Sequence, residues 1–248
     1  PHEGVGLVRL EFIISNYIKI HPNTLIEYNT IKPKLRSEID LVLNGCNPIQ
    51  YYIHELARGI AKIASAYAPY DVIVRFSDFK SNEYANLLGG NYYEPHEENP
   101  MIGWRGASRY YSEKYEEAFG LECKAIKYLR EIIGLDNVVV MIPFCRTVKE
   151  CIQVQETMKE FGLERGVNGL KVFLMCEVPS NVILAEQFSE HIDGFSIGSN
   201  DLTQLTLGLD RDSELVQHIY DEKNEAVKTM MRMAIQSCKK NNTKIGIC

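Results

Sequence analysis

The sequence predicts an α/β protein with an incomplete (β/α)8 barrel, on the basis of two observations. Six short runs rich in Val, Ile, Leu and Phe recur along the chain, and the later runs alternate with helical patterns. Such continuous apolar runs are typical of strands buried on both faces of a parallel sheet. Polar or reactive side chains come directly after several of the strands. In an open doubly wound sheet they would gather at one topological switch point, so their distribution favours a barrel.

The strand-like runs lie at about 4–9, 71–76, 137–143, 170–177, 193–198 and 243–248. Helical patterns follow the later strands at 147–161, 180–190 and 212–241. A barrel of this type has about eight strands. We therefore expect its first and last strands to be missing from this chain, which begins and stops in strand-like runs.

Residues 1–248 are expected to form one domain, because no composition shift or repeat marks a second one. Helical signals at about 12–70 indicate a sizeable insertion after the first visible strand. Residues 77–111 are rich in Asn, Gly, Pro and Glu and predict a long ordered loop over the mouth of the barrel.

Composition excludes several classes of protein. A net charge of −6 argues against non-specific nucleic-acid binding, and no apolar run reaches the roughly 20 residues that span a bilayer. The seven cysteines form no CxxC pair, so a disulfide framework or zinc site is not expected. Reduced thiols predict a cytoplasmic protein.

Three strand ends close on chemically active side chains: Glu177, Asp201 and Cys248. An uncompensated charge is costly to bury, but at the carboxyl end of a barrel strand it points into the active site. Two carboxylates suit Mg²⁺, which commonly takes one or two protein carboxylates and leaves positions for substrate and water. The alternative is that they cap the following helices, which is more plausible for Asp201 than for Glu177.

Cys248 is either a small residue closing a strand or a group that exchanges a proton near neutral pH. Arg9, Arg75 and Arg105 lie at strand or loop ends and suggest a phosphate-like substrate, because guanidinium groups bind such oxygens bidentately. A lone arginine is more often a surface group or a structural ion pair. The segment Gly198-Ser199-Asn200 precedes a helix and would hold an anion, although this signal alone is weak.

Several motifs resemble the phosphoenolpyruvate-utilising enzymes, and the resemblance runs through nearly the whole chain. The motifs lie at 4–12, 75–86, 93–107, 141–144, 175–181 and 195–204, and the last reads Phe195-Ser-Ile-Gly-Ser-Asn-Asp-Leu-Thr-Gln204. The resemblance implies a barrel that binds pyruvate or phosphoenolpyruvate together with Mg²⁺, held by Glu177 and Asp201.

The same resemblance implies roles for the remaining candidates. Arg9, Arg75 and Arg105 would hold the phosphoryl group and the substrate, and Cys248 would exchange the methyl proton of pyruvate. Gly198, Ser199 and Asn200 would contact substrate oxygens. The metal would stabilise enolate charge, and the arginines would neutralise phosphoryl charge.

The stretch that begins Arg75-Phe-Ser-Asp favours the branch of the family that converts ATP, pyruvate and water to AMP, phosphoenolpyruvate and phosphate. That branch is a phosphotransferase with paired acceptors. It also has an ATP-binding domain and a domain that carries a phosphohistidine, and neither is present in these 248 residues. The alternatives are a pyruvate, phosphate dikinase and a phosphorelay protein like the initiator of the sugar phosphotransferase system. A homodimer is compatible with the sequence, which does not determine the oligomeric state.

Overall fold

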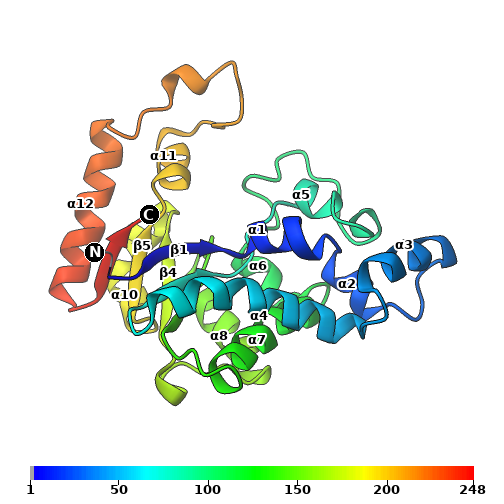
Figure 1. Cartoon of the computed structure of the whole chain (residues 1–248). Helices are drawn as coiled ribbons and strands as arrows, with labels where there is room; N and C mark the ends of the chain where they lie inside the picture. Colours follow the sequence, from blue (N-terminus) through cyan, green and yellow to red (C-terminus); the bar gives the residue numbers. More distant parts are fainter. Residues whose placement is uncertain (1–2) are drawn as a thin grey trace.

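The computed structural model describes residues 3–248, which contain one parallel sheet of six strands (Figure 1). The strands are β1 (Val5–Arg9), β2 (Val72–Arg75), β3 (Val138–Ile142), β4 (Val172–Cys176), β5 (Gly194–Ile197) and β6 (Lys244–Ile247). Each strand pairs with the next one along the chain, in the order β1-β2-β3-β4-β5-β6. The predicted α/β class and all six predicted strands are confirmed.

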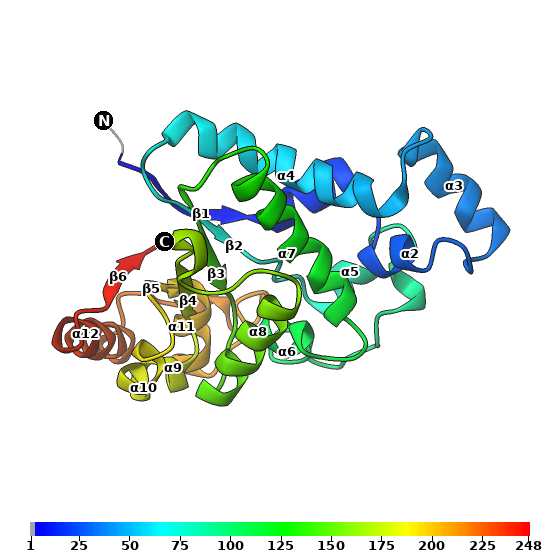
Figure 2. The same cartoon turned by 90° about the horizontal axis from the view of Figure 1, so that it is seen from below.

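Sequential parallel order brings every carboxyl end to the same edge of the sheet. The register places Arg9 beside Arg75, and Arg75 beside Met141 at the end of β3. Ile197 of β5 pairs with Ile247 of β6, immediately before Cys248. The sheet is curved, with six of the eight strands of a complete barrel (Figure 2).

Helices cover the outer face of the sheet (Figure 2). The helices that follow β3 are α8 (Val148–Glu160), α9 (Pro179–Ile183), α10 (Ala185–Ser189), α11 (Ser199–Leu207) and α12 (Glu225–Lys240). Along β3, Val138, Val140 and Ile142 join the large core beneath the helices, whereas Val139 and Met141 join a smaller cluster on the inner face. This alternation follows from the two-residue period of a strand.

The 12–70 region holds α1 (Leu10–Ile13), the π-helical turn η1 (Ile14–Ile18), α2 (Pro22–Ile26), α3 (Pro33–Leu43) and α4 (Pro48–Tyr67). The long α4 packs against α7 (Glu116–Glu131), whereas α3 extends away from the sheet (Figure 1). Residues 77–111 contain α5 (Ser81–Ala85), the 3-10 turn η2 (Gly90–Tyr92) and α6 (Ala107–Tyr110).

Buried ion pairs hold residues 77–111 in place. Glu94 accepts hydrogen bonds from Arg109 at 2.8 and 2.5 Å and lies 3.0 Å from Nε2 of His21 in the first helical region. The Arg109 guanidinium also stacks on Trp104, 4.1 Å from the ring centroid. The Arg109 guanidinium is therefore occupied within this loop.

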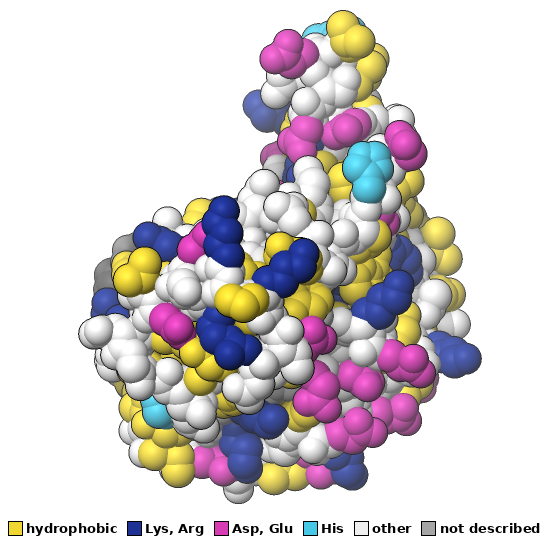
Figure 3. All heavy atoms as spheres, turned by 90° about the vertical axis from the view of Figure 1, so that its right-hand side faces the viewer, with side chains coloured by type: hydrophobic (Ala, Val, Ile, Leu, Met, Phe, Trp, Pro, Cys, Tyr) yellow, Lys and Arg dark blue, Asp and Glu magenta, His cyan; other side chains and the backbone are white. Residues whose placement is uncertain are grey.

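The helix expected at 212–241 is only partly present, because α12 starts at Glu225. Asn224 caps it by accepting a hydrogen bond from Ala226 N at 2.9 Å. Upstream, Asp210 and Asp221 accept hydrogen bonds from backbone N–H groups two residues further on, a local bonding pattern that competes with helix formation. Residues 209–224 therefore form a loop with one 3-10 turn, η4 (Gln217–Ile219), which projects from the body (Figure 3).

No helix within residues 3–248 combines the length and the apolar character needed to cross a membrane.

Candidate active site

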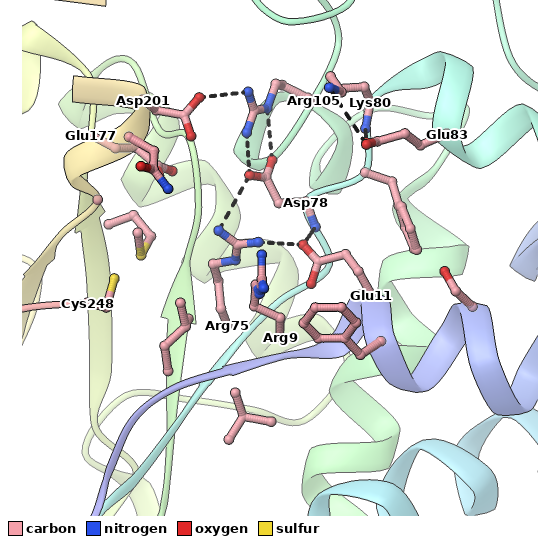
Figure 4. Close-up of a pocket in the computed structure, with 18 of the residues that line it drawn as sticks. Arg9, Glu11, Arg75, Asp78, Lys80, Glu83, Arg105, Glu177, Asp201 and Cys248 are labelled. Atoms are coloured by element: carbon pink, nitrogen blue, oxygen red, sulfur yellow. Dashed lines mark hydrogen bonds and ion pairs between the residues drawn. The ribbon is translucent and has the colours of Figure 1, made fainter. Parts of the chain in front are cut away.

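A pocket of about 950 Å³ opens at the carboxyl edge of the sheet (Figure 4). Its lining includes each residue that the sequence nominated: Arg9, Arg75, Arg105, Glu177, Gly198, Ser199, Asn200, Asp201 and Cys248. Figure 4 shows Glu177 and Asp201 close together, with Cys248 on the same side and the arginines facing them. The strand ends thus bring carboxylates, a thiol and guanidinium groups to one cavity.

Glu177 follows β4 and is 1% exposed. The backbone N–H of Phe144, after β3, donates to its Oε1 at 2.7 Å. Burial, followed by the negative charges of Asp201 and Asp78, raises the pKa of Glu177 to about 8. Gly198 is required beside it, because a Cβ there would lie 2.7 Å from Glu177 Oε2 and from Met175 Cε.

Asp201 is the third residue of α11 and makes no capping hydrogen bond, so the capping alternative does not describe it. Its Oδ1 accepts a hydrogen bond from Arg105 at 3.1 Å, and its Oδ2 accepts one from Arg211 at 3.3 Å. Both guanidinium groups compensate a carboxylate that is 5% exposed. Asp201 is therefore held in the pocket by two guanidinium groups.

Arg105 is also bound by Asp78, whose Oδ1 and Oδ2 accept hydrogen bonds from Nε and Nη2 at 3.1 and 2.5 Å. Its guanidinium lies 4.1 Å from the ring centroid of Phe144. Burial opposes ionisation of Asp78, but the charges of Arg105 and Arg75 outweigh it and hold the pKa of this carboxyl below its usual value. Two cations thus flank one carboxylate at the centre of the pocket.

Arg75 closes β2, and its Nη2 donates to Glu11 at 2.6 Å. Glu11 Oε1 also accepts the backbone N–H of Asp78 at 2.8 Å. Within residues 3–248, the buried Nε of Arg75 has no hydrogen-bond acceptor. Arg9 is exposed, and its guanidinium lies 4.4 Å from the ring centroid of Phe12. Arg75 and Arg9 therefore still have N–H groups that could donate hydrogen bonds to an anion.

The other candidates lie near the projecting loop or at the end of β6. Ser199 donates to Glu222 at 3.2 Å, and Asn200 accepts from Tyr220 at 3.0 Å. Cys248 is an exposed free thiol whose backbone N–H donates to Ile197 O at 3.2 Å. Its position at the end of β6 makes the thiol accessible from the pocket.

The carboxylates fit a divalent cation. Glu177 is buried beside a second carboxylate, and its pKa is raised. A bound cation would reduce the electrostatic repulsion between the two carboxylates. Among residues 3–248, no cluster of three or more His, Cys, Asp or Glu is arranged to hold a metal by itself. Substrate and water would have to supply the remaining ligands, as is usual for Mg²⁺.

The pocket also has charged residues that were not nominated from the sequence: Glu11, Asp78, Lys80, Glu83 and Arg211. Lys80 pairs with Asp212 at 3.1 Å and so joins the 77–111 region to the projecting loop. Asp78 lies within a motif that the sequence singled out. Nothing in the sequence alone showed that its partner would be Arg105, 27 residues further on.

The whole chain, residues 1–248, matches the family described as PEP-utilising enzyme, PEP-binding domain. The chain belongs to this family, as the sequence motifs indicated. Relatives named phosphoenolpyruvate synthase are 58% identical in Synechocystis sp. and 55% identical in both Neisseria meningitidis and Escherichia coli. Each match covers 100% of this chain but 31% of the relative, so the chain spans about a third of their length.

Among solved structures, a HpcH/Hpal aldolase/citrate lyase family protein from Burkholderia cenocepacia aligns with a TM-score of 0.46 and 15% identity. The alignment covers 79% of this chain and 65% of that one.

Proposed function

We propose that this chain is the pyruvate- and phosphoenolpyruvate-binding part of a phosphoenolpyruvate synthase. The observation that carries the proposal is one pocket in which two buried carboxylates and a thiol face three arginines. The family match and the names of relatives at 55–58% identity support it. The complete reaction would convert ATP, pyruvate and water to AMP, phosphoenolpyruvate and phosphate.

The step assigned to this chain is phosphoryl transfer to pyruvate. Cys248 takes a proton from the methyl carbon, and the resulting enolate oxygen forms a bond to the phosphorus of a phosphohistidine. The nitrogen–phosphorus bond breaks, and its electron pair returns to the histidine. Arg9, Arg75 and Arg105 hold the transferring phosphoryl group and the substrate, while Gly198, Ser199 and Asn200 contact substrate oxygens.

Glu177 and Asp201 would hold Mg²⁺, which when bound supplies positive charge to the oxygens of the substrate. Arg105 shares Asp201 with the cation site and therefore stays close to any anion bound there. Its second carboxylate partner, Asp78, keeps the guanidinium in place when Asp201 is engaged elsewhere.

The phosphohistidine and the ATP-binding domain would be supplied by other parts of the same full-length polypeptide. We place this protein in the cytoplasm and allow for a homodimer. The 49–58% identical relatives that carry the synthase name favour water over phosphate as second acceptor.

The proposal is tested with Glu177→Gln in a protein of the relatives' full length that contains this chain. We expect loss of phosphoenolpyruvate formation, whereas ATP-dependent phosphorylation of the distant histidine should persist, because the two half-reactions would use separate sites. A matched control is Glu160→Gln, an exposed position on α8. Unimpaired phosphoenolpyruvate formation by Glu177→Gln would refute the assignment, and equal loss of both half-reactions would indicate damage to the fold.

A further inference from the structure

Residues 75–78 begin with the last residue of β2 and continue into the turn after it, and they carry two charged groups of the pocket, Arg75 and Asp78. Ser77 is fully buried and does not line the pocket. Asp78 binds Arg105 through two hydrogen bonds and lies 3.8 Å from Arg75. A small movement of this turn would therefore change the positions of both guanidinium groups.

Glu122, on α7, binds this turn from behind the sheet. Its Oε2 accepts the backbone N–H of Ser77 at 3.1 Å, and its Oε1 accepts the Ser77 hydroxyl. The Ser77 Oγ also lies 2.6 Å from the hydroxyl of Tyr84, and Tyr110 donates to the Ser77 carbonyl at 2.7 Å. Every polar atom of Ser77 is thus held by a side chain.

The environment of Glu122 is unusual for a carboxyl that only packs. It is 0% exposed, and within residues 3–248 no basic side chain pairs with it. Burying a carboxyl without a cation is unfavourable, so an apolar residue of similar size would suit a purely structural position on α7 better. What a glutamate provides here, and an apolar residue would not, is the pair of acceptors for the hydrogen bonds from Ser77.

The turn is also held from its opposite side. Glu11 Oε1 accepts both the Asp78 backbone N–H and the Arg75 guanidinium. Glu11 lines the pocket, whereas Glu122 does not. Two carboxyls thus fix the backbone of residues 75–78 from its two sides.

We propose that Glu122 is a positioning residue for the phosphoryl-transfer site: through Ser77 it fixes the turn that carries Arg75 and Asp78, and through Asp78 it sets the position of Arg105. The inference rests on the proposed function, because it treats these arginines as the groups that hold the substrate. Geometric errors of about 1 Å at such groups commonly reduce rates by about a hundredfold.

The test uses Glu122→Leu, which removes both acceptors at similar volume, and Glu122→Gln, which keeps the shape and can rebuild the hydrogen bonds with Ser77. Leu129→Ala, at another buried position on α7, is the control for lost stability. In the full-length protein, we expect Glu122→Leu to raise the KM for pyruvate by about tenfold or more and to lower kcat. Leu129→Ala should leave the KM unchanged, and Glu122→Gln should restore much of the activity.

A second measurement does not depend on the reaction. Amide hydrogen exchange over residues 75–79 should become at least tenfold faster in Glu122→Leu than in Leu129→Ala at matched thermal stability. If Glu122→Leu shows wild-type KM and exchange, the positioning role is wrong while the proposed function stands. If the wild-type protein forms no phosphoenolpyruvate, the proposed function fails, and the exchange experiment alone decides whether Glu122 fixes the turn.

Discussion

Cys248 differs from the buried charged residues of the pocket because it is exposed and makes no ion pair. Arg75, Arg105 and Asp201 are held by charged partners, which fix their geometry. The thiol instead lies at the end of β6, beside the carbonyl of Ile197, where its orientation is set by the backbone. On the proposed function, this placement favours proton exchange with the substrate, rather than substrate binding, as the role of Cys248.

We therefore expect Cys248→Ala, in the full-length protein, to lose Mg²⁺-dependent exchange of pyruvate methyl hydrogens with heavy water. The defect should be about 10²–10⁴-fold, the usual contribution of a general acid–base group. The dissociation constant for pyruvate should change little, because the arginines and the metal would bind it. Cys46→Ala is the control, since Cys46 is also an exposed free thiol. Undiminished exchange in Cys248→Ala would return this residue to a packing role.

At the scale of the elements, α7 connects the stability of the fold to pH through Glu122. Burial raises the pKa of Glu122 to about 7, although hydrogen bonds from Ser77 act in the opposite direction. A raised pKa means that the folded chain retains the proton longer than the unfolded chain. The stabilisation is complete below about pH 4.5 and is lost as pH rises through about 7.

The free energy of unfolding should therefore fall by a few kcal/mol between about pH 4.5 and 7, and Glu122→Gln should remove most of the part due to this group. Urea unfolding at a series of pH values measures the slope. Glu131→Gln, at the partly exposed end of the same helix, should keep the wild-type slope. A slope unchanged in Glu122→Gln would mean that this carboxyl ionises as easily in the folded chain as in the unfolded one.

The sequence predicted the strands well and the segment between β5 and β6 less well. Six apolar runs matched six strands, because burial on both faces leaves few alternatives for a run of Val and Ile. The helix expected from 212 failed because side chains such as Asp221 and Asn224 stop or cap a helix locally. Their local hydrogen bonds outweighed the general helical pattern.

Some residues of the pocket could also be predicted from the sequence and others could not. Residues that follow a strand could be nominated because their place in the chain fixes their place at the sheet edge. Glu11, Arg211 and Glu122 could not, because each acts through a partner that only the folded chain brings near. Glu122 lies 45 residues from Ser77 and on the other side of the sheet from the pocket. No local pattern marks such a residue.

At the scale of the whole molecule, a cation bound between Glu177 and Asp201 would stabilise the folded chain, because the unfolded chain does not bring these two carboxylates together. Mg²⁺ should therefore raise the thermal unfolding temperature of the chain. The stabilisation should reach about 2.7 kcal/mol at a concentration a hundred times the dissociation constant. Asp201→Asn and Glu177→Gln should each lose this shift, whereas Glu160→Gln should retain it. A shift of equal size in all four proteins would place the cation elsewhere.

The sequential order of the sheet has a consequence for biosynthesis. Each strand pairs with the strand made just before it, so a chain emerging from the ribosome can add one unit at a time to a growing edge. The arginines of β1 and β2 are then in place first, Glu177 and Asp201 follow, and Cys248 arrives last with β6. The nascent chain thus places Arg9 and Arg75 before Glu177 and Asp201, and Cys248 reaches the pocket only when β6 docks.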